Sequence, residues 1–190
     1  MFSEGTPDHP GPGTDAAWTV SIPSDGLLAY VQTPYRASAR PHQIVITYRI
    51  DAPIGAIPYS HDAAASPCRD HDPCTPVAEF HVFLEQRGAN FSSELDRWWF
   101  KPGFRLTDVA DDSYDAQPFV DDGQVHTITI PLIADQWTSV TGKGTAADFE
   151  TALKNVGWVG ITFGGSDFFA QGVTMEQGTA QFKMIDFRVE

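Results

Sequence analysis

Apolar and polar residues alternate with a period of two in several short segments, as in β-strands that bury one face. In residues 44–50 the apolar side chains occupy every second position, at Ile44, Ile46, Tyr48 and Ile50. Clusters of turn-forming residues separate these segments. The pattern predicts eight strands, at Trp18–Ile22, Leu27–Gln32, Ile44–Ile50, Ala78–Arg87, Arg97–Phe100, His126–Ile130, Trp158–Phe163 and Gln181–Val189.

The strand predicted at residues 80–87 has two different faces. One face is apolar and carries Phe80, Val82 and Leu84. The other face is mixed and carries His81, Phe83, Glu85 and Arg87. A face with aromatic and charged side chains suits a solvated concave surface better than a second core. We therefore expect this strand to place its mixed face toward solvent.

One short helix is predicted near residue 145. Thr145 and Asp148 have the spacing of a capping box, and apolar residues follow at helical spacing, at Phe149, Leu153 and Val156. Gly157 suits the position where such a helix ends. Many short strands with one helix predict an all-β fold, an antiparallel jelly-roll β-sandwich of about eight to ten strands.

The length and composition predict one domain. The chain has 190 residues, of which 42% are hydrophobic, which is enough for one sizeable core over residues 16–190. Residues 1–15 are rich in Pro and Gly and read as a flexible leader. No apolar run is long enough to span a membrane. The formal net charge of −13 would repel a phosphate backbone, so we expect no nucleic-acid partner. We expect a monomer.

The two cysteines, Cys68 and Cys74, lie in a polar, Pro-rich segment. A disulfide between them is the first interpretation, and it implies an oxidising compartment. The alternative is a metal clip that adds His71 and His61 to the two thiolates, although the close spacing typical of structural zinc sites is absent.

Carboxylates gather in a second segment, and they could supply the oxygen ligands that Ca²⁺ prefers. They are Asp108, Asp111, Asp112, Asp115, Asp121 and Asp122. The spacing of an EF-hand is missing, so a solvated loop is the competing interpretation. The sequence contains no G-x-S-x-G nucleophile motif and no H-E-x-x-H metal motif.

Aromatic and hydrogen-bonding residues come together around residues 81–99. Trp rings stack on the apolar faces of sugars, while Arg, Asn and carboxylates bind the hydroxyl rim. Because neighbouring strand residues point to opposite faces, one of Trp98 and Trp99 can serve as a platform while the other anchors the core. The candidate ligand-binding residues are His81, Glu85, Arg87, Asn90, Arg97, Trp98 and Trp99. A purely structural role for both tryptophans is the alternative.

The order of motifs over residues 80–190 resembles the galactose-binding-like β-sandwich of bacterial secreted proteins and carbohydrate-binding modules. The resemblance is carried by Phe83–Gly88, Arg97–Trp99, Leu132, Gln136–Val140, Phe149, Leu153, Val156–Gly157, Val159–Gly165, Phe182 and Phe187. It implies glycan binding on a concave sheet face or in edge loops. The Cys-bearing segment 51–76 departs from a minimal module of this kind.

The leading functional prediction is therefore non-catalytic binding of a polysaccharide. One alternative is a secreted glycoside hydrolase or polysaccharide lyase in which Glu85 and an acidic neighbour act as the catalytic pair. Another is a structural or adhesive domain of a surface protein. The resemblance and the cysteine pair predict a secreted, periplasmic or cell-surface location. The first residues lack the basic and apolar regions of a signal peptide, so a cytosolic protein and a removed signal peptide both stay open.

Overall fold

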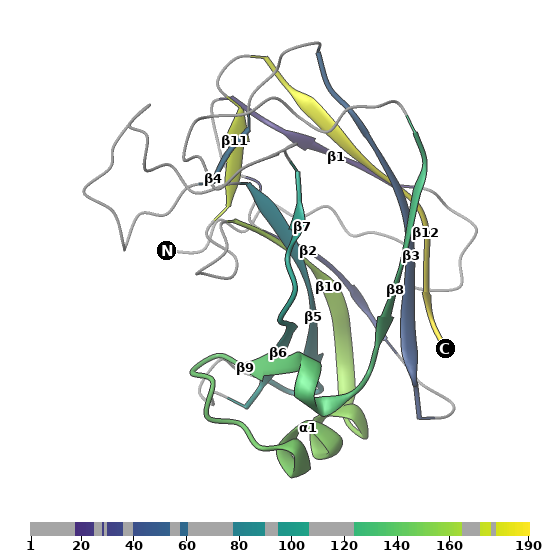
Figure 1. Ribbon diagram of the computed structural model, residues 1–190, viewed down its shortest axis with the longest axis vertical. Coiled ribbons are helices and arrows are strands. Elements are labelled where there is room, and N and C mark those ends of the chain that lie inside the picture. Colours follow the sequence, from purple (N-terminus) through teal and green to yellow (C-terminus); the bar gives the residue numbers. More distant parts are fainter. Residues whose placement is uncertain are drawn as a thin grey trace.

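The computed structural model describes residues 18–24, 28, 30–35, 40–53, 58–60, 78–89, 95–106, 124–164, 172–175 and 178–190 (Figure 1). Within these residues the chain forms mostly β-strands. The strands are β1 (Trp18–Ile22), β2 (Tyr30–Pro34), β3 (Gln43–Asp51), β4 (Pro58–Ser60), β5 (Glu79–Gln86), β6 (Arg97–Phe100), β7 (Phe104–Arg105), β8 (His126–Pro131), β9 (Trp137–Ser139), β10 (Val156–Gly164), β11 (Val173–Met175) and β12 (Ala180–Val189). The helices are the 3-10 turn η1 (Ala134–Gln136) and α1 (Ala146–Leu153).

Two antiparallel sheets face each other. One has the strand order β1-β12-β3-β8, and the other has the order β2-β10-β5-β6-β9, with β7 pairing beside β5. The small strands β4 and β11 pair separately, at the opposite end of the molecule from α1 (Figure 1). All eight predicted strands are present, and those at Trp18–Ile22 and Arg97–Phe100 have the predicted bounds.

The pairing of the eight longer strands is that of a jelly roll. Taken in chain order, the first strand pairs with the eighth, the second with the seventh, the third with the sixth and the fourth with the fifth. This arrangement is a long hairpin rolled into two sheets. The all-β sandwich with one short helix is therefore confirmed.

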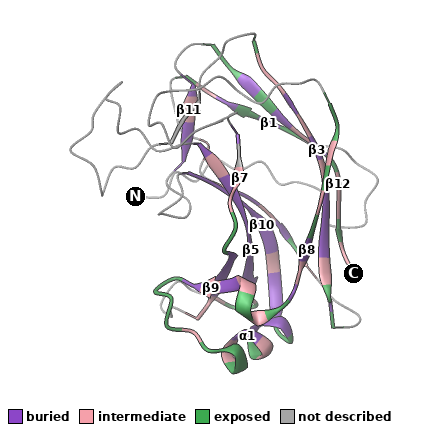
Figure 2. Ribbon diagram, viewed as in Figure 1, coloured by how far each residue is buried: buried purple, intermediate pink, exposed green. Residues whose placement is uncertain are grey.

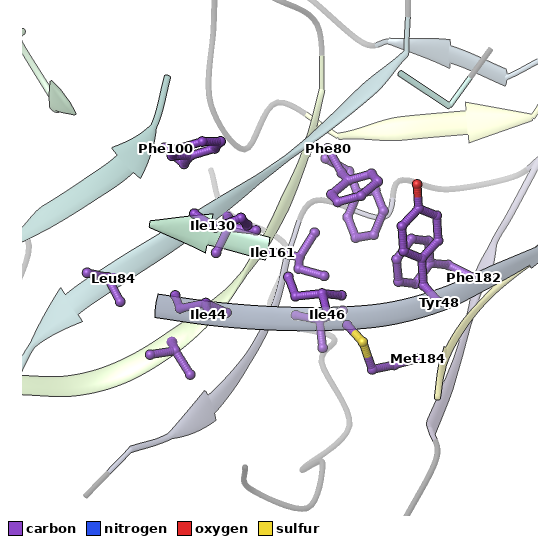
Figure 3. Close-up of a cluster of buried hydrophobic side chains, with 14 of the residues drawn as sticks. Ile44, Ile46, Tyr48, Phe80, Leu84, Phe100, Ile130, Ile161, Phe182 and Met184 are labelled. Carbon is purple, nitrogen blue, oxygen red and sulfur yellow. The ribbon is translucent and has the colours of Figure 1, made fainter. Parts of the chain in front are cut away.

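The core lies between the two sheets (Figure 3). The alternating apolar positions of β3 point into it: Ile44, Ile46, Tyr48 and Ile50 are buried, as their alternation predicts. They meet the apolar face of β5 and the C-terminal strand, where Tyr48 stacks on Phe182 with ring centroids 5.2 Å apart. Figure 2 shows that β5 and β10 are buried along most of their length, unlike β12 at the other sheet.

Helix α1 covers one end of the sandwich (Figure 1). Its predicted capping box is confirmed, because the Thr145 hydroxyl accepts from the Asp148 amide while the Asp148 carboxylate accepts from the Thr145 amide at 2.9 Å. The Thr145 hydroxyl also donates to the Asp148 carboxylate at 2.6 Å, and this bond, together with the one from the Thr145 amide, lowers the pKa of the Asp148 carboxyl. Phe149 anchors the helix by stacking on Trp137, with ring centroids 5.5 Å apart.

The predicted helix end at Gly157 is wrong. Helix α1 ends at Leu153, and Gly157 already belongs to β10. The reason for a glycine there is close packing of β10 against the turn after β5, since a Cβ at Gly157 would lie 2.7 Å from the Cα of Arg87. No helix in the described part of the chain is long and apolar enough to cross a membrane.

Candidate functional site

The candidate residues of β5 and β6 lie on the side of their sheet that points away from the core. Strand register fixes this side, because Phe83 pairs with Trp99, Glu85 pairs with Arg97, and alternate positions share a face. We call it the outer face. Its described positions include Tyr30, Gln32, Pro34, Glu79, His81, Phe83, Glu85, Arg97, Trp99, Thr138, Trp158, Gly160, Thr162 and Gly164.

A buried ion pair lies at the middle of the outer face. Arg97 Nε donates to Glu85 Oε2 at 2.6 Å, and these residues are only 6% and 5% exposed. The guanidinium carbon also lies 5.3 Å from the ring centre of Phe83 and 5.8 Å from that of Tyr30. Arg97 on β6 therefore reaches across the sheet to a residue on the edge strand β2. Its charge is balanced by a carboxylate, and two ring faces also attract the guanidinium.

His81 is bound into the same face near the far end of β5. Its Nδ1 donates to the Phe100 carbonyl at 3.3 Å, and its Nε2 lies 3.4 Å from Glu79 Oε2. The residue is 2% exposed. The approaching backbone is close, since a Cβ at Gly103 would lie 2.8 Å from His81 Cε1. His81 is therefore fixed by its neighbours and presents no ring surface to solvent.

The two adjacent tryptophans point to opposite faces, as predicted. Trp98 is in the core, where it is 1% exposed, donates from Nε1 to the Leu95 carbonyl at 3.1 Å and packs edge-on against Phe149. Trp99 is on the outer face but is only 5% exposed. Of the two proposed platforms, Trp98 is thus a core residue, and Trp99 lies opposite Phe83 and Thr138 within the outer face.

The expectation that the mixed face of β5 is solvated is wrong. His81, Phe83 and Glu85 are as buried as the apolar residues between them. Two features make this burial tolerable. The carboxylate of Glu85 is paired with a cation, and the ring of Phe83 fills the space above Gly160, where a Cβ would lie 2.6 Å from Phe83 Cε1.

Three side chains of the outer face are partly exposed at its β2 edge: Tyr30, Gln32 and Trp158. The sequence reasoning missed them as site residues. Trp158 opens an apolar run that reads as a strand buried on both faces, and Tyr30 lies in a segment with few other signals. The register of β2 and β10 puts them on the same face, because Trp158 pairs with Pro34 and Thr162 pairs with Tyr30.

Two further groups lie near Trp158. Arg87, a predicted ligand-binding residue, is exposed in the turn after β5, and its amide donates to the Asn155 carbonyl at 2.8 Å. Tyr35 donates its amide to the Gly157 carbonyl at 2.8 Å. Burial raises the pKa of the Tyr35 phenol, so this group stays neutral at ordinary pH.

Several predictions concern residues outside the described ranges. They are the ligand-binding role of Asn90, the disulfide or metal clip of Cys68 and Cys74, the leader at 1–15 and the calcium-binding acidic segment at 108–122. Among the described residues, no group of three or more His, Cys, Asp or Glu side chains is arranged to hold a metal ion. The predictions of calcium and of the disulfide stay predictions.

Comparison with known proteins assigns no family to this chain. The sequence matches no protein-family model, and no curated protein shows significant similarity to it. The fold and the outer face therefore define the class of protein: an antiparallel jelly-roll sandwich with a buried, aromatic and ion-paired sheet surface.

Proposed function

We propose that this protein is a carbohydrate-binding β-sandwich that holds a polysaccharide on its outer face without altering it. The observation that supports this proposal is the grouping of Arg97, Glu85, Tyr30 and Phe83 on one sheet surface. Sugars present apolar faces and a rim of hydroxyls, so their sites combine aromatic rings with a few oriented polar groups.

Two observations favour binding over the hydrolase or lyase alternative. The Glu85 carboxylate is paired with Arg97 at 2.6 Å and is almost fully buried, whereas a catalytic carboxyl must reach the reacting atoms. Glu79 shares its face but lies six residues away, about 20 Å along a strand. Paired glycosidase carboxyls lie about 5–10 Å apart.

The partly exposed aromatic side chains favour binding over a purely structural or adhesive role. Tyr30 and Trp158 lie at one edge of a face whose other aromatic side chains are buried. A structural domain has no need of aromatic rings left open beside a buried ion pair. The two-sheet fold is also compatible with the galactose-binding-like resemblance, and we include membership of that class, with its secreted location, in the proposal.

The test is retention of the full chain on a glycan array, with released reducing ends measured in the same wells. We expect retention without new reducing ends. Parallel wells with EDTA report whether calcium takes part. New reducing ends that disappear in Glu85→Gln would show that the protein is an enzyme and would refute the non-catalytic role. A chain retained on no glycan would point to the structural role instead.

A further inference from the structure

An aromatic residue and two cations lie where β5 ends and β10 begins, at the α1 end of the sandwich (Figure 1). They are Trp158, Arg87 and Lys154, and we call them the Trp158 corner. Trp158 is partly exposed on the outer face, while Arg87 and Lys154 are exposed. Lys154 caps the end of α1, four residues before Trp158. The corner therefore offers a ring and two positive charges at the rim of the outer face.

The backbone holds Arg87 against the start of β10. The Arg87 amide donates to the Asn155 carbonyl at 2.8 Å. The register of β10 with β5 shifts by one residue between Val156 and Trp158, so Gly157 is the extra residue of a β-bulge. A Cβ at Gly157 would lie 2.7 Å from the Arg87 Cα, so a larger residue would push the two segments apart. The bulge therefore brings Arg87 close to Trp158.

A tight turn exposes the Arg87 side chain at this point. The Ala89 amide donates to the Gln86 carbonyl at 3.2 Å, which closes a four-residue turn with Arg87 and Gly88 at its centre. Gly88 has a φ of 75°, the left-handed conformation that a type II turn requires at its third residue. The position of Arg87 is thus fixed by its own backbone bond and by the turn around it.

The two cations of the corner have no acidic partner among the described residues. Glu85 is paired with Arg97 at 2.6 Å, and Glu150 on α1 is paired with Arg40. Ten of the twelve basic residues lie in the described ranges, against nine of the twenty-five acidic residues. The net charge of −13 is therefore carried by residues outside these ranges. The corner itself is positively charged, so it complements an anionic group.

A ring beside an unpaired guanidinium suits a sugar that carries a carboxylate. The Trp158 ring offers contact area to the C–H face of the sugar. The planar fork of Arg87 matches a carboxylate, to which it donates two parallel N–H bonds. Lys154 adds a second positive charge one residue from the Asn155 carbonyl that binds the Arg87 amide.

We propose, on the basis of the proposed function, that the Trp158 corner binds a sugar residue that carries a carboxylate, so that the ligand is a uronate-containing polysaccharide. Trp158 stacks on the sugar ring, Arg87 donates to the carboxylate, and Lys154 adds to the attraction. The buried middle of the outer face takes no part in this contact.

The test is isothermal titration calorimetry of the full chain with oligogalacturonate, oligomannuronate and hyaluronan oligosaccharides. Each is compared with the same oligosaccharide after its carboxyl groups have been reduced to hydroxymethyl groups. A carrageenan oligosaccharide supplies sulfate without carboxylate, and EDTA is present so that calcium cannot bridge two carboxylates. We expect at least one acidic oligosaccharide to bind and its reduced form to bind at least about tenfold more weakly.

Four variants locate the site. Arg87→Gln and Trp158→Ala should each weaken binding about tenfold, and Lys154→Gln severalfold. Arg87→Lys keeps the charge without the fork, so it should recover only part of the affinity.

Lys143→Gln is the matched control, because Lys143 is an exposed cation between β9 and α1. It removes the same charge and should bind like the wild type. Urea midpoints of all variants show whether each is folded.

The outcomes separate this inference from the proposed function. Reduced oligosaccharides that bind as tightly as the acidic ones, or binding to the sulfated probe alone, would overturn the carboxylate ligand while carbohydrate binding stands. Acidic binding that is unchanged in folded Arg87→Gln and Trp158→Ala would overturn the Trp158 corner. A chain that binds none of these probes but is retained on a neutral glycan of the array would overturn this inference alone. Absence of binding in both experiments would overturn the proposed function as well.

Discussion

Replacing Arg97 by methionine tests whether the outer face depends on its buried ion pair. Methionine keeps most of the aliphatic stem but removes the charge, so Glu85, 5% exposed, loses the cation 2.6 Å away. Removing one partner of a buried pair costs about 3–5 kcal/mol. The guanidinium contacts with Tyr30 and Phe83 are lost as well, and each such contact contributes about 0.5–2 kcal/mol.

We therefore expect Arg97→Met to lower the free energy of unfolding by about 4 kcal/mol. For a chain of 190 residues this corresponds to a fall in melting temperature of about 8–16 °C. The measurement is equilibrium unfolding in urea, followed by tryptophan fluorescence and by far-UV circular dichroism. Coincidence of the two transitions shows that the free energies of variant and wild type are comparable.

A double-variant cycle with Glu85→Leu supplies the control. Glu85→Leu alone leaves a buried guanidinium and should also destabilise strongly, whereas the double variant removes both charges. Replacing a whole buried pair by apolar residues is often neutral or stabilising by about 1–4 kcal/mol. We expect the double variant to recover most of the loss. Single variants that each cost under about 1 kcal/mol, or costs that simply add, would refute the buried, coupled pair.

Two other perturbations test separate parts of the fold. Gly160→Ala should destabilise by about 1–3 kcal/mol in urea, because its Cβ would lie 2.3 Å from the Val31 carbonyl oxygen; wild-type stability would contradict this packing. Asp51→Asn should make stability less dependent on pH, since Lys183 and Arg49 lower the pKa of Asp51. A lowered folded pKa stabilises above the unfolded value of about 3.9, and this stabilisation is lost as pH falls through the folded pKa. The wild type should exceed the variant by at most about 1 kcal/mol at pH 6, and a gap that persists unchanged at pH 2.5 would disprove the linkage.

The strands could be predicted because their signal is local. Alternation at Ile44, Ile46 and Tyr48 indicates which side of the strand is buried, whichever strand pairs with it. The start of α1 is equally local, since Thr145 and Asp148 bond to each other. The helix end was predicted wrongly because the glycine at position 157 is required by its close contact with Arg87, seventy residues away in the chain. Local sequence rules do not detect such a contact.

The candidate site was predicted only in part, for a related reason. Residue types marked Glu85, Arg97 and Trp99 as unusual for a strand surface, and they do share one face. Their burial depends on pairing across strands, which the sequence does not display. The partly exposed residue Trp158 was missed because a strand with apolar residues at successive positions does not indicate which face is exposed to solvent.

The faces of the two sheets that point away from the core differ in polarity and burial, and the difference bears on function. The outer side of β3 and β12 is polar, with exposed or half-buried ion pairs such as Arg49 with Asp51 and Arg188 with Asp186, each at 2.7 Å. One buried face per sheet is enough for a sandwich.

The β5 sheet adds a second buried layer of rings around one ion pair, and that layer is not needed to close the core between the sheets. The layer does fix one side chain of the sheet edge. Tyr30, on an edge strand, is held by a guanidinium 5.8 Å from its ring centre. An aromatic ring that is already fixed loses less conformational entropy when a ligand stacks on it. The fixed Tyr30 ring at a partly exposed edge is therefore an argument for the proposed carbohydrate-binding role.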